Sequence, residues 1–357
     1  MSTTLPEIGY YALSRHPVVP ADLVAEARVA DEIGLGAAFV SERFNVKDAT
    51  VLSGALAAAT VRMGIGVAAT NHHTRHPIVT ATAGATLAEL SSGRFALGLG
   101  RGIGAQWQIL GLPTVTGAQI ADAVGVLRRL WSGEMIVGHD GPIGSYPLLN
   151  LGVTVRVPIM LVTMSPATLR LAGEIADGVV LHTFLSDDAT RNAVDTVRTA
   201  ADRAGRDPAS IRIWSVVATV SDTLDPPDRR RRLYGRLATY LQGYGDVLAR
   251  ANGWRTADLD AVRESAPFTS ARGPIDASAT DDDIAALADV MPASWVTDCA
   301  TGSAAECART IDAQFALGVD SVILHGATPT ELAPVVDEYR RIRSRSVELP
   351  TNPGWMR

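Results

Sequence analysis

Short apolar runs alternate with longer amphipathic segments along most of the chain. The runs are typical of strands buried on both faces, and we expect them at residues 8–13, 37–42, 63–70, 94–100, 157–163, 177–183, 210–221 and 319–326. The segments between them indicate helices; the one from residue 20 to Gly34, for example, has apolar residues at 23, 24, 27, 30 and 33. Strands that are each followed by a helix predict an α/β fold, and their number favours a (β/α)8 TIM barrel over a doubly wound sheet.

Two segments depart from this alternation. Residues 225–300 contain arginine-rich helical sequence at 229–250 and a stretch rich in Gly, Pro and Asp at 273–283. We therefore predict one domain over 1–357, with a helical insertion at 225–300 between the seventh strand and the following barrel helix. Residues 134–149 predict a β-hairpin that turns at Asp140-Gly141.

The fourth predicted strand opens into a glycine-rich loop, within "SSGRFALGLGRGIGAQW" at 91–107. Gly100, Gly102 and Ala105 match the dinucleotide pattern G-x-G-x-x-G/A, which requires a helix directly after it and an acid at the end of the next strand. The sequence "AQWQILGLP" that follows lacks a helical period, and Asp122 falls inside a predicted helix. The glycines therefore indicate either backbone that lies against a flat ligand or a tight bend at the rim.

Polar side chains collect after the predicted strands, on the face where barrel enzymes carry their active sites. Six of the seven histidines lie there: His16, His72, His73, His76, His182 and His325. Glu42 and Arg43 end the second strand, and Thr70 ends the third. The segment "NHHTRHP" lacks a nearby carboxylate, and Pro77 disfavours a helical His76, so we predict no metal site.

The loop after the fifth strand suggests an anion site. Ser165 is a good N-cap residue and Pro166 suits the first helical turn, so the free amides and the hydroxyls of Thr163 and Ser165 would receive a phosphate. An ordinary capped helix remains the alternative.

Composition narrows the class of protein. The net charge of −6 disfavours nucleic acid or an anionic membrane as a partner. The two cysteines cannot form a disulfide framework, and no apolar stretch approaches the ~18 residues that span a bilayer. With no signal-peptide pattern at the N-terminus, we expect a cytoplasmic protein acting on a small molecule. Lys47 is the only lysine, so a Schiff-base enzyme would have a single candidate amine.

The segment "HPIVTATAGATLAELSSGRFALGLGRG" resembles the strongest signature of the luciferase-like monooxygenase family. "ARVADEIGLGAAFVSERF", "VPIMLVTMSPATLRLAGEIADGVVL" and "GSAAECARTIDAQFALGVDSVILHG" are similar to further blocks of that family. The resemblance implies a TIM barrel, a homodimer, and reduced FMN or the deazaflavin coenzyme F420 at the barrel mouth. It also implies a non-prolyl cis peptide near Val67–Ala69. The residues that it implies for cofactor binding are Val67, Ala68, Thr70, Gly100, Gly102, Gln106, Thr163, Met164 and Ser165.

The segments "SERF", "TNHHTRHP" and "GRG" resemble the deazaflavin branch more closely. One sugar-phosphate-oxidising branch carries an acidic residue near position 103, where this chain has Ile103 beside Arg101. Glu42, His73 and His182 are therefore the acid/base candidates, with Glu42 contacting the cofactor or orienting His73 and a histidine titrating near ~6.5 moving the proton. We predict hydride transfer between F420 and an organic substrate; an FMN-dependent monooxygenase and a catalytically silent flavin-binding partner protein are the alternatives.

Overall fold

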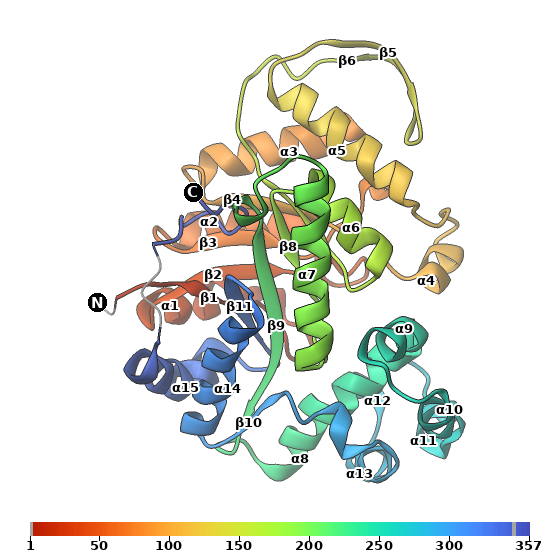
Figure 1. Cartoon of the computed structure of the whole chain (residues 1–357). Coiled ribbons are helices and arrows are strands. Elements are labelled where there is room, and N and C mark those ends of the chain that lie inside the picture. Colours follow the sequence, from red (N-terminus) through yellow and green to blue (C-terminus); the bar gives the residue numbers. More distant parts are fainter. Residues whose placement is uncertain (1–2, 345–347) are drawn as a thin grey trace.

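The computed structural model describes residues 3–344 and 348–357. Eight parallel strands close into a barrel, in which each strand pairs with the next and the last pairs with the first (Figure 1). In order, they are β1 (Leu5–Tyr11), β2 (Leu35–Val40), β3 (Gly64–Val67), β4 (Phe95–Leu99), β7 (Ile159–Val162), β8 (Gly178–Val180), β9 (Arg212–Ser221) and β11 (Ser321–His325). The predicted (β/α)8 TIM barrel is confirmed.

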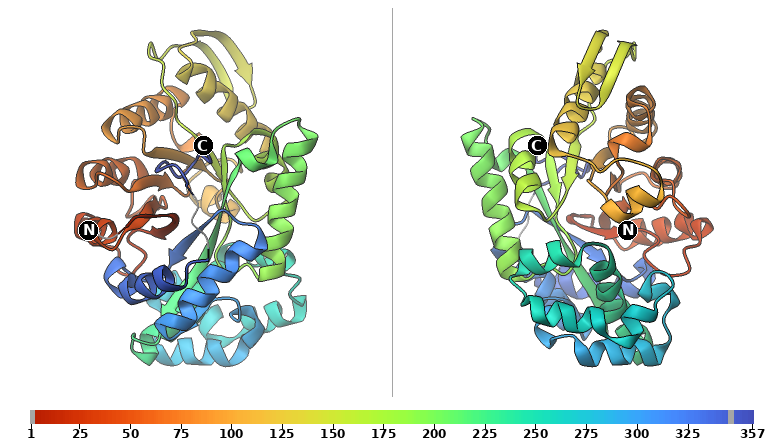
Figure 2. Two further views of the ribbon diagram at one scale, coloured as in Figure 1. Left: turned by 60° about the vertical axis from the view of Figure 1, so that its left-hand side comes forward. Right: turned by 90° about the vertical axis from the view of Figure 1, so that its right-hand side faces the viewer.

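Helices surround the barrel (Figure 2). They are α1 (Leu23–Glu32), α2 (Ala49–Ala59), α3 (Pro77–Leu90), α5 (Gly117–Trp131), α6 (Pro166–Ile175), α7 (Asp187–Arg203), α14 (Ala304–Gln314) and α15 (Pro329–Ile342). Side-chain caps set several of their starts: Ser186 accepts from the amide of Ala189, and Ser303 forms a capping box with Glu306. Short 3-10 turns lie at Pro20–Asp22, His72–Thr74, Pro208–Ser210, Ala293–Trp295 and Phe315–Leu317. No helix in the described ranges is long and apolar enough to cross a membrane.

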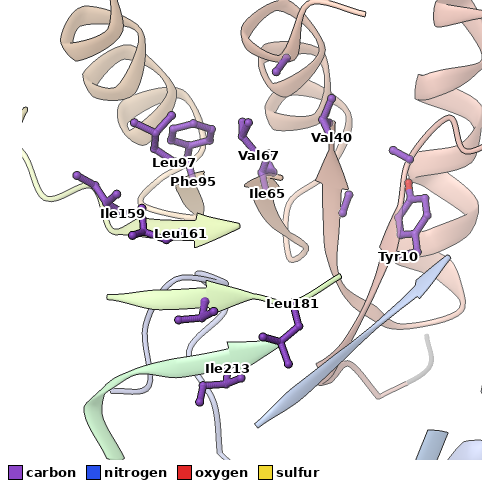
Figure 3. Packing of buried hydrophobic residues seen from close by; sticks show 14 of the residues in the cluster. Tyr10, Val40, Ile65, Val67, Phe95, Leu97, Ile159, Leu161, Leu181 and Ile213 are labelled. Atoms are coloured by element: carbon purple, nitrogen blue, oxygen red, sulfur yellow. The ribbon is translucent and has the colours of Figure 1, made fainter. Parts of the chain in front are cut away.

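Two apolar layers result from the alternation of side chains along the strands. Phe39, Met160 and Trp214 point into the barrel, where the rings of Phe39 and Trp214 meet edge-on at 4.8 Å. The opposite faces pack against the helices, and Figure 3 shows part of that layer, including Phe95 and Leu161.

The C-terminal segment lies against the amino ends of the strands. Asn352 donates from its side chain to the carbonyls of Gly93 and Phe95, and the indole of Trp214 donates to the Pro353 carbonyl at 2.8 Å. The carboxyl ends of the strands form the other end of the barrel, called the mouth below.

The predicted insertion is helical. It contains α8 (Pro226–Arg230), a wide turn at Arg231–Gly235, α9 (Arg236–Asn252), α10 (Thr256–Glu264), α11 (Ala266–Ser270), α12 (Ile275–Ser278) and α13 (Asp281–Val290), and β10 (Ala300–Gly302) then pairs with β9. These helices gather on one side of the barrel (Figure 1) around an apolar cluster of their own. Met164, from the loop after β7, packs on this cluster, so the insertion contacts the mouth.

Two local predictions were wrong. The hairpin forms, with β5 (Ile136–Gly141) antiparallel to β6 (Gly144–Leu149), but Gly141 pairs with Gly144, which places the turn at Pro142-Ile143 instead of Asp140-Gly141. A short helix, α4 (Gly104–Ile109), begins inside the glycine loop where no helical period was found. Buried Trp107 anchors it, because tertiary packing can hold a short helix that its own periodicity does not specify.

Candidate active site

The chain bulges after β3 at a cis peptide between Ala68 and Ala69, which confirms the predicted non-prolyl cis bond. Hydrogen bonds join the bulge to both neighbours in the barrel. The amide of Ala68 donates to the Val40 carbonyl at 2.8 Å, and the amide of Glu42 donates to the Ala69 carbonyl at 3.2 Å. Ala68 belongs to the cluster inside the barrel, whereas the side chain of Val67 packs in the outer layer. Only the backbone of Val67 is therefore available to the mouth.

The glycine loop lies directly beside this bulge. The amide of Gly100 donates to the Thr70 carbonyl at 2.9 Å, and the Asn71 side chain donates to the Gly100 carbonyl at 2.6 Å. A Cβ on Gly100 would lie 3.6 Å from the Val162 carbonyl at the end of β7. The segments after β3, β4 and β7 thus meet at one part of the mouth.

Packing within the chain explains two of the glycines. A Cβ on Gly98 would lie 1.8 Å from the Val67 carbonyl, and one on Gly102 would lie 2.0 Å from the Trp107 ring. Gly102 also has a φ of +66°, which favours glycine. The tight bend is therefore the better explanation of these two glycines, whereas Gly100 meets only Ala69 Cβ and Val162 within 4 Å. Gln106 is half-buried on α4 beside Trp107.

The loop after β7 has the geometry expected of an anion site. Ser165 caps α6 by accepting from the amide of Thr168, and its own amide donates to the Thr163 hydroxyl at 3.1 Å. Thr163, Met164 and Ser165 are all half-buried, so their polar atoms stay accessible. Pro166 has no N–H and the Thr168 amide is already capped, which leaves the Ala167 amide and the hydroxyls of Thr163 and Ser165 for a phosphate.

Glu42 lies in an ion pair at the edge of the bulge. Its carboxylate accepts from the Thr70 hydroxyl and from both terminal nitrogens of Arg75, at 2.8 and 2.5 Å. The Glu42 side chain is 3% exposed, and its hydrogen bonds raise the pKa of Arg75 further above its usual value. The hypothesis that Glu42 orients His73 is wrong, because the carboxylate is directed to Thr70 and Arg75.

His73 packs its ring on Trp107, with the centroids 4.6 Å apart and nearly perpendicular. In the described part of the chain, its nitrogens make no hydrogen bond to a side chain. Burial lowers the pKa of His73 because it disfavours the imidazolium form.

His182, after β8, is fixed through both ring nitrogens. Nδ1 lies 2.7 Å from the Thr183 carbonyl and Nε2 lies 2.8 Å from the Tyr244 hydroxyl, a pattern that fits a neutral ring protonated on Nδ1. Burial lowers the pKa of His182 to about 4. The expectation of titration near ~6.5 is therefore wrong for this residue, since its enclosure among Tyr240, Tyr244 and the strand ends excludes the charged form.

A buried polar network joins the insertion to the mouth. Arg236 of α9 donates to the Asp276 carboxylate at 2.5 Å and to the Ser14 carbonyl at 2.7 Å, and it lies 3.0 Å from Nε2 of His325. Nδ1 of His325 lies 2.8 Å from the Thr183 hydroxyl. Sequence reasoning placed His325 at the mouth but missed its partners, which are distant along the chain.

The tyrosines of α9 were also missed. Tyr240 and Tyr244 are four residues apart on α9, which is kinked at Tyr244, and both rings contact His182 at 4.8 Å between centroids. A spacing of four residues places two side chains on the same helical face, so the spacing of these tyrosines in the sequence could have indicated them.

A surface hollow of about 840 Å³ lies away from the mouth between α6 and α7. Arg170, Asn192 and Thr199 contribute to its lining. It gathers none of the residues considered above.

The donor set at the mouth fits a flat, phosphate-tailed redox cofactor. The bulge at Ala68 and the backbone at Gly100 form a surface with small side chains, and the capped start of α6 offers hydroxyls and amides beyond it. Backbone and hydroxyl groups of this kind orient a cofactor without supplying its chemistry.

Comparisons with known proteins agree with this geometry. A relative from Beutenbergia cavernae, an F420-dependent glucose-6-phosphate dehydrogenase, is 32% identical over 193 residues, covering 48% of this chain and 55% of that protein. The chain spans 55% to 61% of the length of the first two curated relatives that it matches.

Two solved structures share the fold. The coenzyme F420-dependent tetrahydromethanopterin reductase from Methanopyrus kandleri superposes with a TM-score of 0.78 at 20% identity, over 96% of this chain and 99% of that one. An oxygenating component of a Baeyer–Villiger monooxygenase from Pseudomonas putida, in complex with FMN, superposes with a TM-score of 0.62 at 18% identity, over 95% and 97%. The family model described as luciferase-like monooxygenase matches residues 6–321. The chain belongs to the luciferase-like monooxygenase family.

Proposed function

We propose that this protein transfers a hydride between coenzyme F420 and a small organic substrate at the barrel mouth. The observation that carries the proposal is the meeting of three segments, after β3, β4 and β7, around the cis peptide at Ala68. The names of an F420-dependent relative and of an F420-dependent structural neighbour support the choice of cofactor.

In this proposal, the cofactor's phosphate-bearing tail binds at Thr163, Met164 and Ser165. Its ring lies along the backbone from Val67 to Thr70 and from Gly100 to Gln106. F420 supplies two-electron chemistry when bound, and the protein contributes binding, orientation and the handling of one proton.

The protonation states and contacts of the polar side chains suggest which of them handle the proton. His182 is neutral at pH 7 and accepts a hydrogen bond from Tyr244, so this pair holds a proton that neither group readily loses to water. One ring nitrogen of His73 faces the Pro113 carbonyl, and in this proposal the other accepts a proton from a substrate hydroxyl. Glu42 acts as a positioning residue, because its contacts to Thr70 and Arg75 hold the bulge in place.

The test is a titration of the full chain with F420 and, separately, with FMN, followed by the cofactor's absorbance and fluorescence. We expect F420 to bind and Ser165→Ala to weaken its binding about tenfold, through loss of a hydrogen bond to a charged group. Ser186→Ala is the matched control, since Ser186 caps the next helix in the same way.

The outcomes separate the alternatives. Binding of FMN with flavin-dependent oxygen uptake would favour the monooxygenase, and binding of F420 without turnover of any alcohol or carbonyl compound would favour a silent partner protein. Binding of neither cofactor contradicts the proposal. Sedimentation of the same sample tests the proposed homodimer.

A further inference from the structure

Arg43 follows Glu42 in the loop after β2 and has no carboxylate partner in the described part of the chain. Its guanidinium is half-buried, and its hydrogen-bonding neighbour is Nε2 of His16 at 3.3 Å. A guanidinium presents donors in a planar fork that matches a carboxylate or phosphate. Arg75, by contrast, forms ion pairs with two carboxylates, those of Glu42 and Asp48.

A second cation lies beneath Arg43. Lys47 is 4% exposed, and its ammonium nitrogen donates to the Ser41 hydroxyl at 3.1 Å and to the Leu13 carbonyl at 3.4 Å. Both partners are uncharged. Burial, together with the charges of Arg43 and Arg236, lowers the pKa of Lys47 to about 7.

The nearby carboxylates already have partners. Asp276 accepts from Arg236 and from the Thr239 hydroxyl and lies 3.3 Å from His16. Glu26 accepts from the amide of Leu13 at 2.9 Å, and burial raises its pKa, which weakens its negative charge. This part of the mouth therefore carries an excess of positive charge, which is costly to bury without an anion.

The excess charge lies next to the proposed cofactor surface. The Tyr11 hydroxyl donates to the Ala68 carbonyl at 3.2 Å, and the Tyr11 ring lies 4.8 Å from that of His325. Burial lowers the pKa of His325, and the charges of Arg236 and Arg43 lower it further, which places Arg43 in the same group. Tyr244 is also close enough to sense the charge of Arg43.

We propose that Arg43, supported by Lys47, binds an anionic group of the substrate, a carboxylate or a phosphate. This inference rests on the proposed function, since it names the substrate class of that site. The carbon that gains or loses the hydride then lies between the anionic group at Arg43 and the backbone at Ala68.

The test uses the fact that Lys47 is the only lysine of the chain. Protein made with carbon-13 lysine gives one lysine side-chain signal, which reports the pKa of Lys47 without a chemical modification. Inorganic phosphate and acetate are titrated in turn, with and without F420. We expect the bound anion to raise the pKa of Lys47, because an opposite charge favours the ammonium form. The anion that acts at the lower concentration identifies phosphate or carboxylate as the group.

Three variants assign the effect to Arg43. Arg43→Gln should weaken the anion about 10- to 100-fold, and Arg43→Lys, which keeps the charge but loses the fork, should weaken it less. Arg15→Gln is the matched control, because Arg15 is 52% exposed near the same loop and makes only a 3.8 Å contact with Glu331. Its anion affinity should equal that of the unaltered chain.

Two results would overturn the inference. One is a Lys47 signal that neither phosphate nor acetate shifts; the other is an anion response in Arg43→Gln that equals that of the unaltered chain. Either result, together with normal F420 binding, leaves the proposed function intact and removes only the anionic substrate. If F420 fails to bind while the anions still shift the Lys47 signal, the proposed function is contradicted and the anion site at Arg43 is retained.

Discussion

Arg236 offers a direct test of how the insertion is held on the barrel. Its side chain is 5% exposed and makes three contacts: Asp276 of α12, the Ser14 carbonyl, and His325 of β11. Arg236→Met keeps much of the volume and removes every one of these bonds. The Asp276 carboxylate, which is 3% exposed, then loses its closest cation.

The expected cost follows from this burial. Removing one partner of a buried pair leaves an uncompensated charge and costs about 3–5 kcal/mol. An unfolding entropy of about 2.1 cal/mol/K per residue gives about 0.75 kcal/mol/K for a chain of 357 residues. The melting temperature should therefore fall by about 4–7 °C.

The assay is a double-mutant cycle of Arg236→Met and Asp276→Asn, measured by urea unfolding and by thermal melting. Each single variant leaves a buried charge or its donors without a partner, so each should be strongly destabilised. The double variant removes both charges and should be no less stable than either single variant.

Additive costs in this cycle would refute the reasoning. Additivity would mean that water reaches both groups, so that the pair is not desolvated and contributes no more than a surface pair of ~0–1 kcal/mol. A loss of F420 binding in Arg236→Met with unchanged unfolding would show instead that the network acts on the site alone.

Three further predictions use single replacements. Gly102→Ala should cost about 1–3 kcal/mol more than Gly138→Ala, because both glycines have φ near +66° but only Gly102 faces a ring, that of Trp107; equal costs in urea unfolding would contradict the clash. His182→Gln should flatten the pH dependence of stability between pH ~6.5 and about 4, since the buried neutral ring makes the unaltered chain lose up to about 3 kcal/mol as the pH falls through that window; an unchanged slope would contradict the neutral ring. Burial alone would raise the pKa of Asp276, but His16 and Arg236 hold it well below its usual range. The ionised Asp276 therefore contributes its full stabilisation above pH ~4 and loses it as the pH falls further. The difference in unfolding free energy between the unaltered chain and Asp276→Asn should therefore shrink in acid. A difference that is independent of pH would contradict the pairing of this carboxylate.

The barrel could be predicted because its information is local. Each buried strand and each amphipathic helix repeats a period that the sequence displays, and Ser165 or Ser186 marks a helix start within a few residues. The hairpin turn was misplaced by two residues, because the pairing of Gly141 with Gly144 depends on the whole ladder and not on the Asp-Gly pair.

The partners within the site could not be predicted, because they join residues that are far apart along the chain. Glu42 was expected to contact the cofactor or to orient His73. Its carboxylate bonds to Arg75, and nothing local distinguishes Arg75 from the other arginines. The protonation state of His182 likewise depends on Tyr244, which is 62 residues away. Sequence reasoning located the mouth and its polar residues, whereas their pairing required the fold.

Helix α9 connects the insertion to several parts of the mouth. Gly243 packs on Ile103 of the glycine loop, Tyr244 bonds to His182 after β8, and Arg236 bonds to His325 of β11. One inserted helix thus contacts three sides of the mouth, while the expected cofactor surface comes from β3, β4 and β7 alone. Tyr244 and Arg236 contact β8 and β11, which lie outside the expected cofactor surface, so we expect changes at these positions to act on the substrate. Gly243 packs on the glycine loop, so a change there should alter the cofactor surface as well. Replacing Tyr240, whose ring contacts His182 and His325, should therefore change substrate binding while leaving F420 affinity unaltered.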